Sequence, residues 1–150
     1  MAGLWFDQFE IGQRFVHEIR RTVTDGDNML FSSLTYNPAA IHIDHDYAAS
    51  TEFGRPLMNS IFTLGLVIGL SVQDTTFGTT VANLGMKETV FPRPVFAGDT
   101  IRAETEVLAL RSSSSRPGQG IATFRHIGLN QRDEIVCDTT RAALMMGRPA

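Results

Sequence analysis

The pattern of apolar and polar positions divides the chain into a mixed first half and a strand-rich second half. Residues 14–24 alternate in patches, which predicts a strand. Thr24 and the acidic residues after it favour a short helix over about residues 25–34, because such side chains cap helix amino termini. A proline-containing turn follows, and residues 46–53 predict a second short helix.

Residues 56–73 contain no charged side chain. A run of about 18 apolar residues approaches the length of a membrane span, but Asn59 and Thr63 make its first half too polar for one. We predict instead a long helix that begins at Pro56, because proline suits the first helical turn. A helix that is apolar nearly all round is expected to be buried on several sides.

The second half of the chain is typical of strands, because residues 79–91 are rich in β-forming residues and the first part of residues 100–111 alternates. The predicted strands cover residues 79–91, 100–111, 121–130 and 134–146, with a turn at 92–99 and a hairpin loop at 111–120. Helices separated in sequence from an antiparallel sheet define an α+β domain, and residues 1–150 have the length of one domain. The sheet edges of such a domain stay open, so we expect a homodimer or a higher homo-oligomer.

Charge and cysteine content narrow the choice of partners. The formal net charge of −3 argues against nucleic acid or an anionic membrane surface as the main partner. Cys137 stands alone, which excludes an intrachain disulfide, and it is interpreted as a small half-buried strand residue. The first residues lack the order of a signal peptide, so a cytoplasmic, reducing location is expected, with no membrane segment.

The chain has four histidines, of which His17 and His126 fall in predicted strands and are interpreted as structural. The other two lie in the segment 42–46, which alternates two histidines with two aspartates. Side chains that follow one another in a turn do not all point inward, and no second ligand cluster exists, so we expect no metal site. Asp44 or Asp46 is expected to cap the short helix that follows.

One longer segment resembles a known family. Residues 36–60, YNPAAIHIDHDYAASTEFGRPLMNS, resemble the signature of the MaoC-like dehydratases, the (R)-specific enoyl-CoA hydratases with a hotdog fold. The family pattern is D-x-N-P-[IL]-H-x-D, then a short helix, then P-[IL]-x-H-G at the start of the central helix. Residues 91–107, FPRPVFAGDTIRAETEV, resemble a strand and turn of the same family. The resemblance extends over about residues 10–146.

The resemblance implies a hotdog fold, in which an antiparallel sheet wraps around one long buried helix. It also implies syn hydration of a 2-enoyl-CoA thioester, or the reverse dehydration, with no cofactor besides the CoA of the substrate. His42 matches the catalytic histidine of the family. Ser60 matches a glycine whose backbone N–H holds the thioester oxygen, and Asn59 stands at the family's second histidine. A free N–H at a helix amino terminus suits the charge that develops on an enolate.

The chain departs from the family at the catalytic aspartate. A gap-free match places Asn37 at that position, a match of the N-P pair places Thr35 there, and neither side chain can take a proton. Three alternatives follow: His42 is the only base and Asn37 orients the water, a carboxylate such as Asp44 or Asp27 replaces the aspartate, or the chain does not hydrate. We favour the first, because asparagine keeps the shape of aspartate and histidine titrates near pH 6.5.

Residues 53–86 resemble a narrower branch of the family, which acts on C5 dicarboxylic thioesters of the mesaconyl-CoA or itaconyl-CoA kind. A second carboxylate requires a cation, and Arg55 and Arg93 are the candidates for it or for a CoA phosphate. The leading hypothesis is therefore an enoyl-CoA hydratase. The alternatives are a hotdog thioesterase, which typically has a carboxylate near the helix start, and a non-catalytic acyl-CoA-binding or partner subunit.

Overall fold

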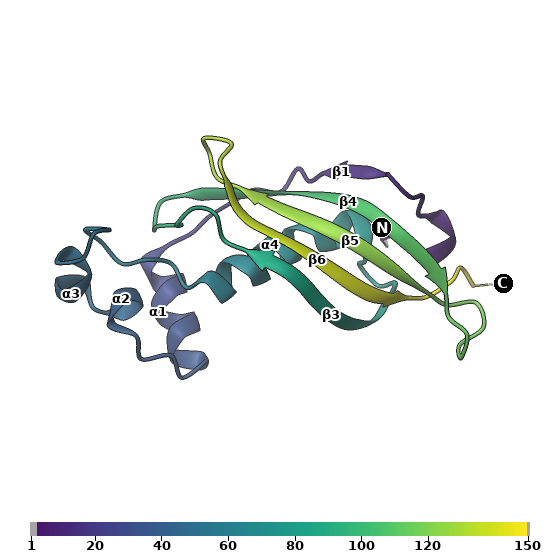
Figure 1. Ribbon diagram of the computed structural model, residues 1–150, viewed down its shortest axis with the longest axis horizontal. Coiled ribbons are helices and arrows are strands. Elements are labelled where there is room, and N and C mark those ends of the chain that lie inside the picture. The colour runs from purple at the N-terminus through teal and green to yellow at the C-terminus, as the bar shows by residue number, and fades with distance from the viewer. Residues whose placement is uncertain (1–2, 150) are drawn as a thin grey trace.

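The structure is a computed structural model, and it describes residues 3–149. A curved sheet and one long helix, α4 (Ser60–Thr75), form the body of the molecule, and three short helices project from one end (Figure 1). The short helices are α1 (Asp25–Leu34), α2 (Ala40–Ile43) and α3 (His45–Ala49). The strands are β1 (Arg14–Val16), β2 (Arg21–Thr22), β3 (Thr80–Val90), β4 (Thr100–Ser112), β5 (Gly120–Leu129) and β6 (Ile135–Met145), preceded by a 3-10 turn, η1 (Phe6–Gln8).

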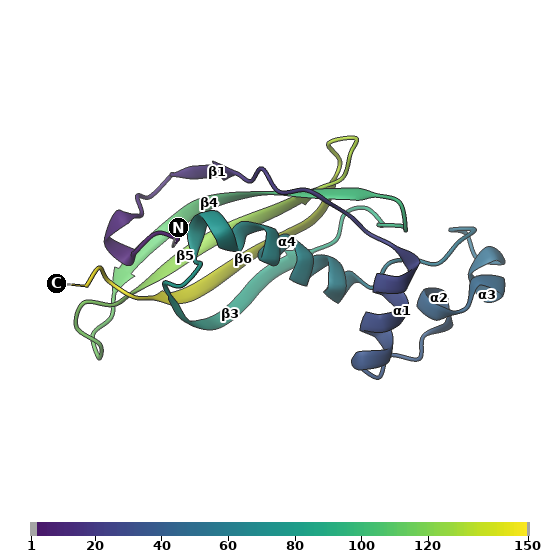
Figure 2. The same cartoon turned by 180° about the vertical axis from the view of Figure 1, so that it is seen from behind.

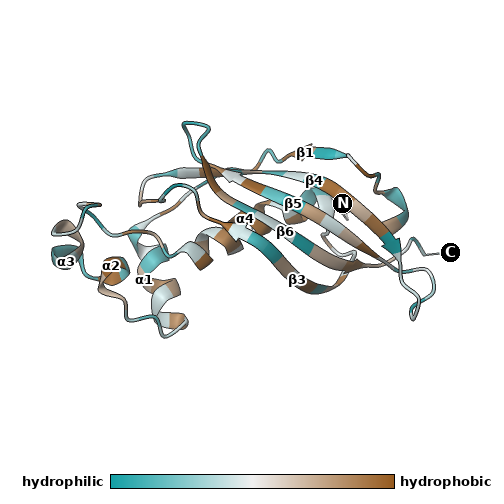
Figure 3. Ribbon diagram, viewed as in Figure 1, coloured by the Kyte–Doolittle hydropathy of each residue, from teal (hydrophilic) through white to brown (hydrophobic). Residues whose placement is uncertain are grey.

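The sheet is antiparallel throughout, in the order β1-β4-β5-β6-β3, with β2 also paired to β4. It curves around α4, which is plainest from behind (Figure 2). Apolar and polar residues alternate along the strands (Figure 3), because successive side chains face the helix and the outside in turn. The α+β class is confirmed, and each of the four strands predicted after residue 78 is correct to within one residue at each end.

The prediction of one continuous strand over residues 14–24 is wrong. The segment forms two short strands, because His17 N–H bonds to Ala103 O while Arg21 already pairs with Ile101. Residues 18–20 therefore stand opposite a single residue of β4 and bulge away from the sheet. The His17 side chain turns inward at this point and is only 3% exposed.

The long helix begins at Ser60, so the predicted start at Pro56 is wrong. Leu57 N–H bonds to Ile41 O and Met58 N–H bonds to Val95 O, which keeps this segment extended. The Asn59 side chain then accepts a hydrogen bond from Ile61 N–H and begins the helix as its N-cap. A good capping residue outweighs the preference of proline for the first turn here.

The short helices also differ from expectation. The sequence does not predict α2, because the proline-containing segment before His42 is typical of a turn. α3 covers residues 45–49 and is shorter than the predicted 46–53. The Asp44 side chain caps it by accepting a hydrogen bond from Tyr47 N–H at 3.0 Å, which confirms the capping prediction.

One side of α4 packs on the inner face of the sheet, and its buried residues are Thr63, Val67, Leu70, Ser71 and Thr75. Gly128 of β5 allows this close approach, because a Cβ there would overlap a methyl group of Val67. The opposite flank of the helix is open and carries the exposed residues Ile61, Gly65, Gly69 and Gln73. Most of the other helix residues are buried or half-buried, so the expected burial on several sides is confirmed except along this one open flank. No helix of residues 3–149 is long and apolar enough to cross a membrane.

Candidate functional site

The imidazole of His42, at the end of α2, is fixed by one hydrogen bond. Its Nδ1 lies 2.6 Å from the carbonyl oxygen of Leu57, which can only accept. Nδ1 therefore carries the proton, and in neutral histidine this leaves the lone pair on Nε2. Nε2 has no hydrogen-bond partner among the described residues. The half-buried ring is thus set up to accept a proton at Nε2.

His42 is hydrogen-bonded to Leu57, which lies three residues before the first residue of α4, Ser60. The N–H of Ile61 donates to the Asn59 side chain, and the N–H of Thr63 donates to the Asn59 carbonyl oxygen. The N–H of Ser60 has no acceptor within residues 3–149. It combines with the positive end of the helix dipole to form a donor for a developing negative charge.

A pocket of about 220 Å³ opens at this helix start. Its walls are mostly apolar and include Leu57 and Ser60. His42 is not part of the lining, but its Nδ1 is hydrogen-bonded to the Leu57 carbonyl oxygen. The lining residues are Phe53, Leu57, Met58, Ser60, Thr63, Phe91, Arg93, Pro94, Val95 and Val136. None of them is an aspartate or a glutamate, so the carboxylate that a hotdog thioesterase would require near the helix start is not in this lining.

Two arginines lie at or near the pocket. Arg93 belongs to the lining, its side chain is 61% exposed, and its Nε is 3.7 Å from Glu134 Oε1. Arg55 stacks on the ring of Phe96 with 4.0 Å between the guanidinium carbon and the ring centroid. An exposed stacked guanidinium keeps its N–H groups free for an anion.

The two asparagines predicted to act at the site have local hydrogen bonds of their own. Asn37 is half-buried before α2, and its Oδ1 accepts a hydrogen bond from Ala39 N–H at 3.1 Å. Its Nδ2 has no hydrogen-bond partner among the described residues, and no hydrogen bond joins Asn37 to His42. Asn59 is 4% exposed, and besides the cap its Nδ2 lies 3.5 Å from Ser32 Oγ. The observed bonds of Asn59 are structural, and its contact with substrate stays a prediction.

The two carboxylates considered as replacement bases already have partners. Asp27 lies 2.6 Å from an Arg21 nitrogen and accepts from Thr24 N–H at 2.8 Å. Burial raises the pKa of this carboxyl, but the hydrogen bonds from Arg21 and Thr24 outweigh it and hold the pKa below its usual value. Asp44 caps α3. Asp27 is thus held by Arg21 and Thr24, whereas the second oxygen of Asp44 has no partner among residues 3–149.

The histidine–aspartate segment does not form a metal cluster. His45 Nε2 lies 3.6 Å from Asp25 Oδ1 of α1, whereas His42 points to Leu57. Within residues 3–149, no group of three or more histidine, cysteine, aspartate or glutamate side chains is arranged to hold a metal ion.

One functional candidate was missed in the sequence, namely Asn28 of α1. Its buried side chain donates hydrogen bonds to the carbonyl oxygens of His42 and Leu57. The sequence carries no signal for it, because the burial of Asn28, and of Ser32 one turn later, is seen only in the structure. A helix face that buries polar residues is unusual, because buried polar groups need partners.

The remaining histidines and the cysteine are structural, as predicted. His17 and His126 are buried and bonded to each other through the hydroxyl of Thr105. Cys137 is fully buried rather than half-buried, and burial, with a smaller effect of Asp138, raises the pKa of its thiol to about 11. A thiol with that pKa is protonated at neutral pH and is a poor nucleophile.

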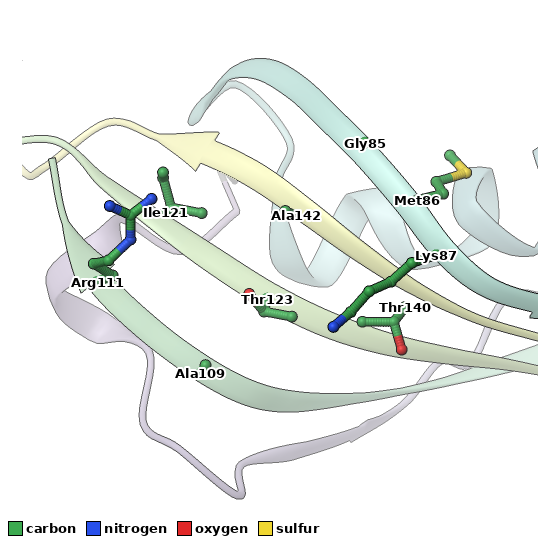
Figure 4. A pocket seen from close by; sticks show the side chains of 9 residues that line it. All are labelled: Gly85, Met86, Lys87, Ala109, Arg111, Ile121, Thr123, Thr140 and Ala142. Atoms are coloured by element: carbon green, nitrogen blue, oxygen red, sulfur yellow. The ribbon is translucent and has the colours of Figure 1, made fainter.

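A second hollow, of about 480 Å³, lies on the outer face of the sheet between β3 and β4 (Figure 4). Its floor consists of small residues such as Thr123 and Ala142, and Lys87 and Arg111 line it as well. Lys87 and Arg111 are the ionisable side chains of its lining, which contains no histidine, aspartate or glutamate.

Known proteins resemble this chain over nearly its whole length. The family model described as "MaoC like domain" matches residues 7–128. The chain belongs to the MaoC-like family. A mesaconyl-CoA hydratase from Cereibacter sphaeroides is 31% identical over 98% of this chain, which covers 42% of that protein. The chain thus spans less than half the length of this curated relative.

Solved structures agree with the family assignment. The MaoC-like dehydratase from Rhodospirillum rubrum superposes with a TM-score of 0.84 at 28% identity, over 99% of this chain and 100% of that one. A Mycobacterium tuberculosis protein with a double hotdog fold superposes with a TM-score of 0.87 at 30% identity, over 98% of this chain and 45% of that one. The MaoC-like chain therefore has the hotdog fold that the resemblance implied.

Proposed function

We propose that the chain is a hydratase that adds water to the double bond of a 2-enoyl-CoA thioester, or removes it in reverse. The observation that carries the proposal is the fixed tautomer of His42, whose Nε2 is free while Nδ1 donates to Leu57 O. The same Leu57 lines the pocket that holds the start of α4. A base, an oxyanion donor and an apolar pocket are the parts that this reaction requires.

In the hydration direction, His42 Nε2 removes a proton from a water molecule while the water oxygen attacks C3 of the enoyl thioester. The electron pair of the double bond moves to the thioester oxygen, where the Ser60 N–H and the helix dipole stabilise the enolate. One such donor is typically worth about 2.7–4 kcal/mol in the transition state. The imidazolium of His42 then returns its proton to C2. We assign the water contact to Asn37 Nδ2, which has no other partner among the described residues.

The substrate that we propose has a short acyl group with a second carboxylate, such as a C5 dicarboxylic enoyl-CoA. The pocket of about 220 Å³ is small, and Arg93 supplies a cation at its lining. Arg55, stacked on Phe96, is placed for the second carboxylate or for a phosphate of CoA. The similarity to a mesaconyl-CoA hydratase supports the same choice.

We further propose that two copies of the chain form a two-fold homodimer along β3. This strand is at the edge of the sheet, and it exposes the apolar side chains Val81, Leu84, Met86 and Val90. An apolar edge strand of this length invites pairing with another strand. Pairing there would also bring a second chain toward the open flank of α4. A cytoplasmic location stays a prediction from the sequence.

The test is turnover of crotonyl-, mesaconyl- and itaconyl-CoA by the purified protein, followed by the loss of the conjugated thioester absorbance. We expect turnover that disappears in His42→Ala and persists in His45→Ala, the exposed neighbouring histidine. Activity retained by His42→Ala would exclude His42 as the base. Release of free CoA thiol would indicate a thioesterase, and tight acyl-CoA binding without turnover would indicate a binding subunit.

A further inference from the structure

Helix α1 buries a polar side chain against the candidate site. Asn28 is 2% exposed, although it lies in a helix whose other side faces solvent. A buried amide without partners destabilises a fold, so the hydrogen bonds of Asn28 indicate which groups its side chain holds in place. All of its partners belong to the segments that carry the histidine and the helix start.

The Asn28 amide makes three hydrogen bonds. Its Nδ2 donates to His42 O at 2.9 Å and to Leu57 O at 3.0 Å. Its Oδ1 accepts from Asn59 N–H at 2.9 Å. We infer that Asn28 is a positioning residue, which sets the base and the oxyanion donor relative to each other through these bonds. The inference rests on the proposed function, since it assigns Asn28 a role in that reaction.

Only a side-chain amide matches these partners. The two carbonyl oxygens need donors and the Asn59 N–H needs an acceptor, and asparagine offers both from one planar group. The opposite orientation of the amide would place its oxygen against two carbonyl oxygens, so the partners fix the orientation. Aspartate has almost the same shape but, when ionised, supplies no donor.

The Leu57 carbonyl connects Asn28 to the chemistry of His42. This oxygen accepts from both Asn28 Nδ2 and His42 Nδ1. Asn28 thereby holds the acceptor that keeps the proton on Nδ1 and the lone pair on Nε2. Its bond to Asn59 N–H holds the residue directly before Ser60. One side chain therefore contacts both halves of the site.

Helix α1 is itself firmly attached, so it can act as a rigid support. Thr24 and Asp27 form a capping box at its start, and Arg21 forms an ion pair with Asp27. Phe31 packs edge-on against Phe62 of α4, with ring centroids 5.7 Å apart. A support of this kind is what holds catalytic groups within the small tolerance that a reaction allows.

The test compares Asn28→Asp with the unmodified protein in turnover of the preferred enoyl-CoA. We expect kcat to fall by about 100-fold, the typical effect of a misplacement of about 1 Å, while KM changes by no more than about threefold. Thr105→Val is the matched control, because it breaks buried hydrogen bonds between His17 and His126 and touches no residue of the site. It should lower stability and leave kcat unchanged when assayed well below its unfolding temperature.

A second readout does not depend on turnover. Nitrogen NMR of the His42 ring in the unmodified protein should show the proton on Nδ1, and in Asn28→Asp this preference should be lost. Unchanged kcat, or an unchanged Nδ1 tautomer in Asn28→Asp, would overturn the positioning role. If the unmodified protein turned over no enoyl-CoA, the proposed function would fail. The NMR comparison would then still show whether Asn28 sets the His42 tautomer. If Asn28 does not set it, the positioning role fails as well.

Discussion

Acidification should destabilise the protein through a buried chain of hydrogen bonds that runs from Arg141 to Asp74. Arg141 Nε–H donates to His126 Nε2 at 3.2 Å, and since arginine can only donate, the proton of neutral His126 is on Nδ1. His126 Nδ1–H then donates to the Thr105 hydroxyl at 2.9 Å, and that hydroxyl donates to His17 Nε2 at 2.8 Å. His17 Nδ1–H completes the chain by donating to Asp74 at 2.7 Å. A second proton on His126 would face the guanidinium of Arg141.

The size of the effect follows from the pKa of His126. Burial and the positive charge of Arg141, with a smaller effect of His17 when it is protonated, lower the pKa of His126 from 6.5 to about 3. Because the folded-state pKa is below the unfolded one, the unfolded chain binds the extra proton between these values, and stability falls as the pH falls from about 6.5 to 3. A difference of about 3.5 pKa units corresponds to about 5 kcal/mol in all, with a slope approaching about 1.4 kcal/mol per pH unit.

The assay is urea unfolding at several pH values between about 7 and 4, within the titration range of histidine. His126→Asn keeps a polar side chain but removes the titrating ring. As the pH falls, the unfolding free energy of this variant should therefore decrease less steeply than that of the unmodified protein, by about 1.4 kcal/mol per pH unit. His45→Gln, which removes an exposed histidine, should follow the unmodified protein. Parallel stability curves for the unmodified protein and His126→Asn would refute the reasoning. So would a His126 NMR signal that titrates near pH 6 in the folded protein.

Three further predictions concern the packing, the substrate and the cysteine. Gly128→Ala should lower the free energy of unfolding by about 1–3 kcal/mol in urea, because the added Cβ would overlap the stiff, buried Val67. Arg93→Ala should raise KM for mesaconyl-CoA by about tenfold or more and leave KM for crotonyl-CoA nearly unchanged, because only the former has a second carboxylate; equal changes would contradict this role. Cys137 should resist alkylation at neutral pH until urea unfolds the chain, since burial raises the pKa of its thiol to about 11; rapid labelling of the folded protein would contradict the structure.

The sequence predicts the sheet well and its amino-terminal edge poorly. The first part of β4 and nearly all of β5 alternate between buried and half-buried residues, because one face of each packs toward α4 and the other is outside. The segment 14–24 alternates too, but its inward turn at His17 depends on Asp74 and Thr105, which are distant in sequence. The start of α4 was misplaced for a related reason. Proline and Asn59 both favour a helix start, and only the bond of Met58 to Val95 shows which one applies.

The candidate site divides in the same way. The resemblance to a family pattern led to His42 and Ser60; Ser60 lines the pocket, and His42 is hydrogen-bonded to Leu57, which also lines it. It could not lead to Asn28, because all three partners of this amide are backbone groups, 14 to 31 residues away. Backbone groups are the same in every residue, so such partners leave no pattern in the sequence.

The imidazoles near the two ends of α4 differ in how many of their nitrogens are bonded. At the amino-terminal end, His42 bonds through one nitrogen only, to a backbone carbonyl, and its second nitrogen stays open. Toward the carboxyl-terminal end, His17 and His126 each bond through both nitrogens, inside a chain that ends on opposite charges at Arg141 and Asp74. A proton can be taken up freely only where a nitrogen is unpaired. The bonding of these imidazoles therefore separates His42, which has an open nitrogen, from His17 and His126, which have none, and this difference supports the proposal that His42 is the base.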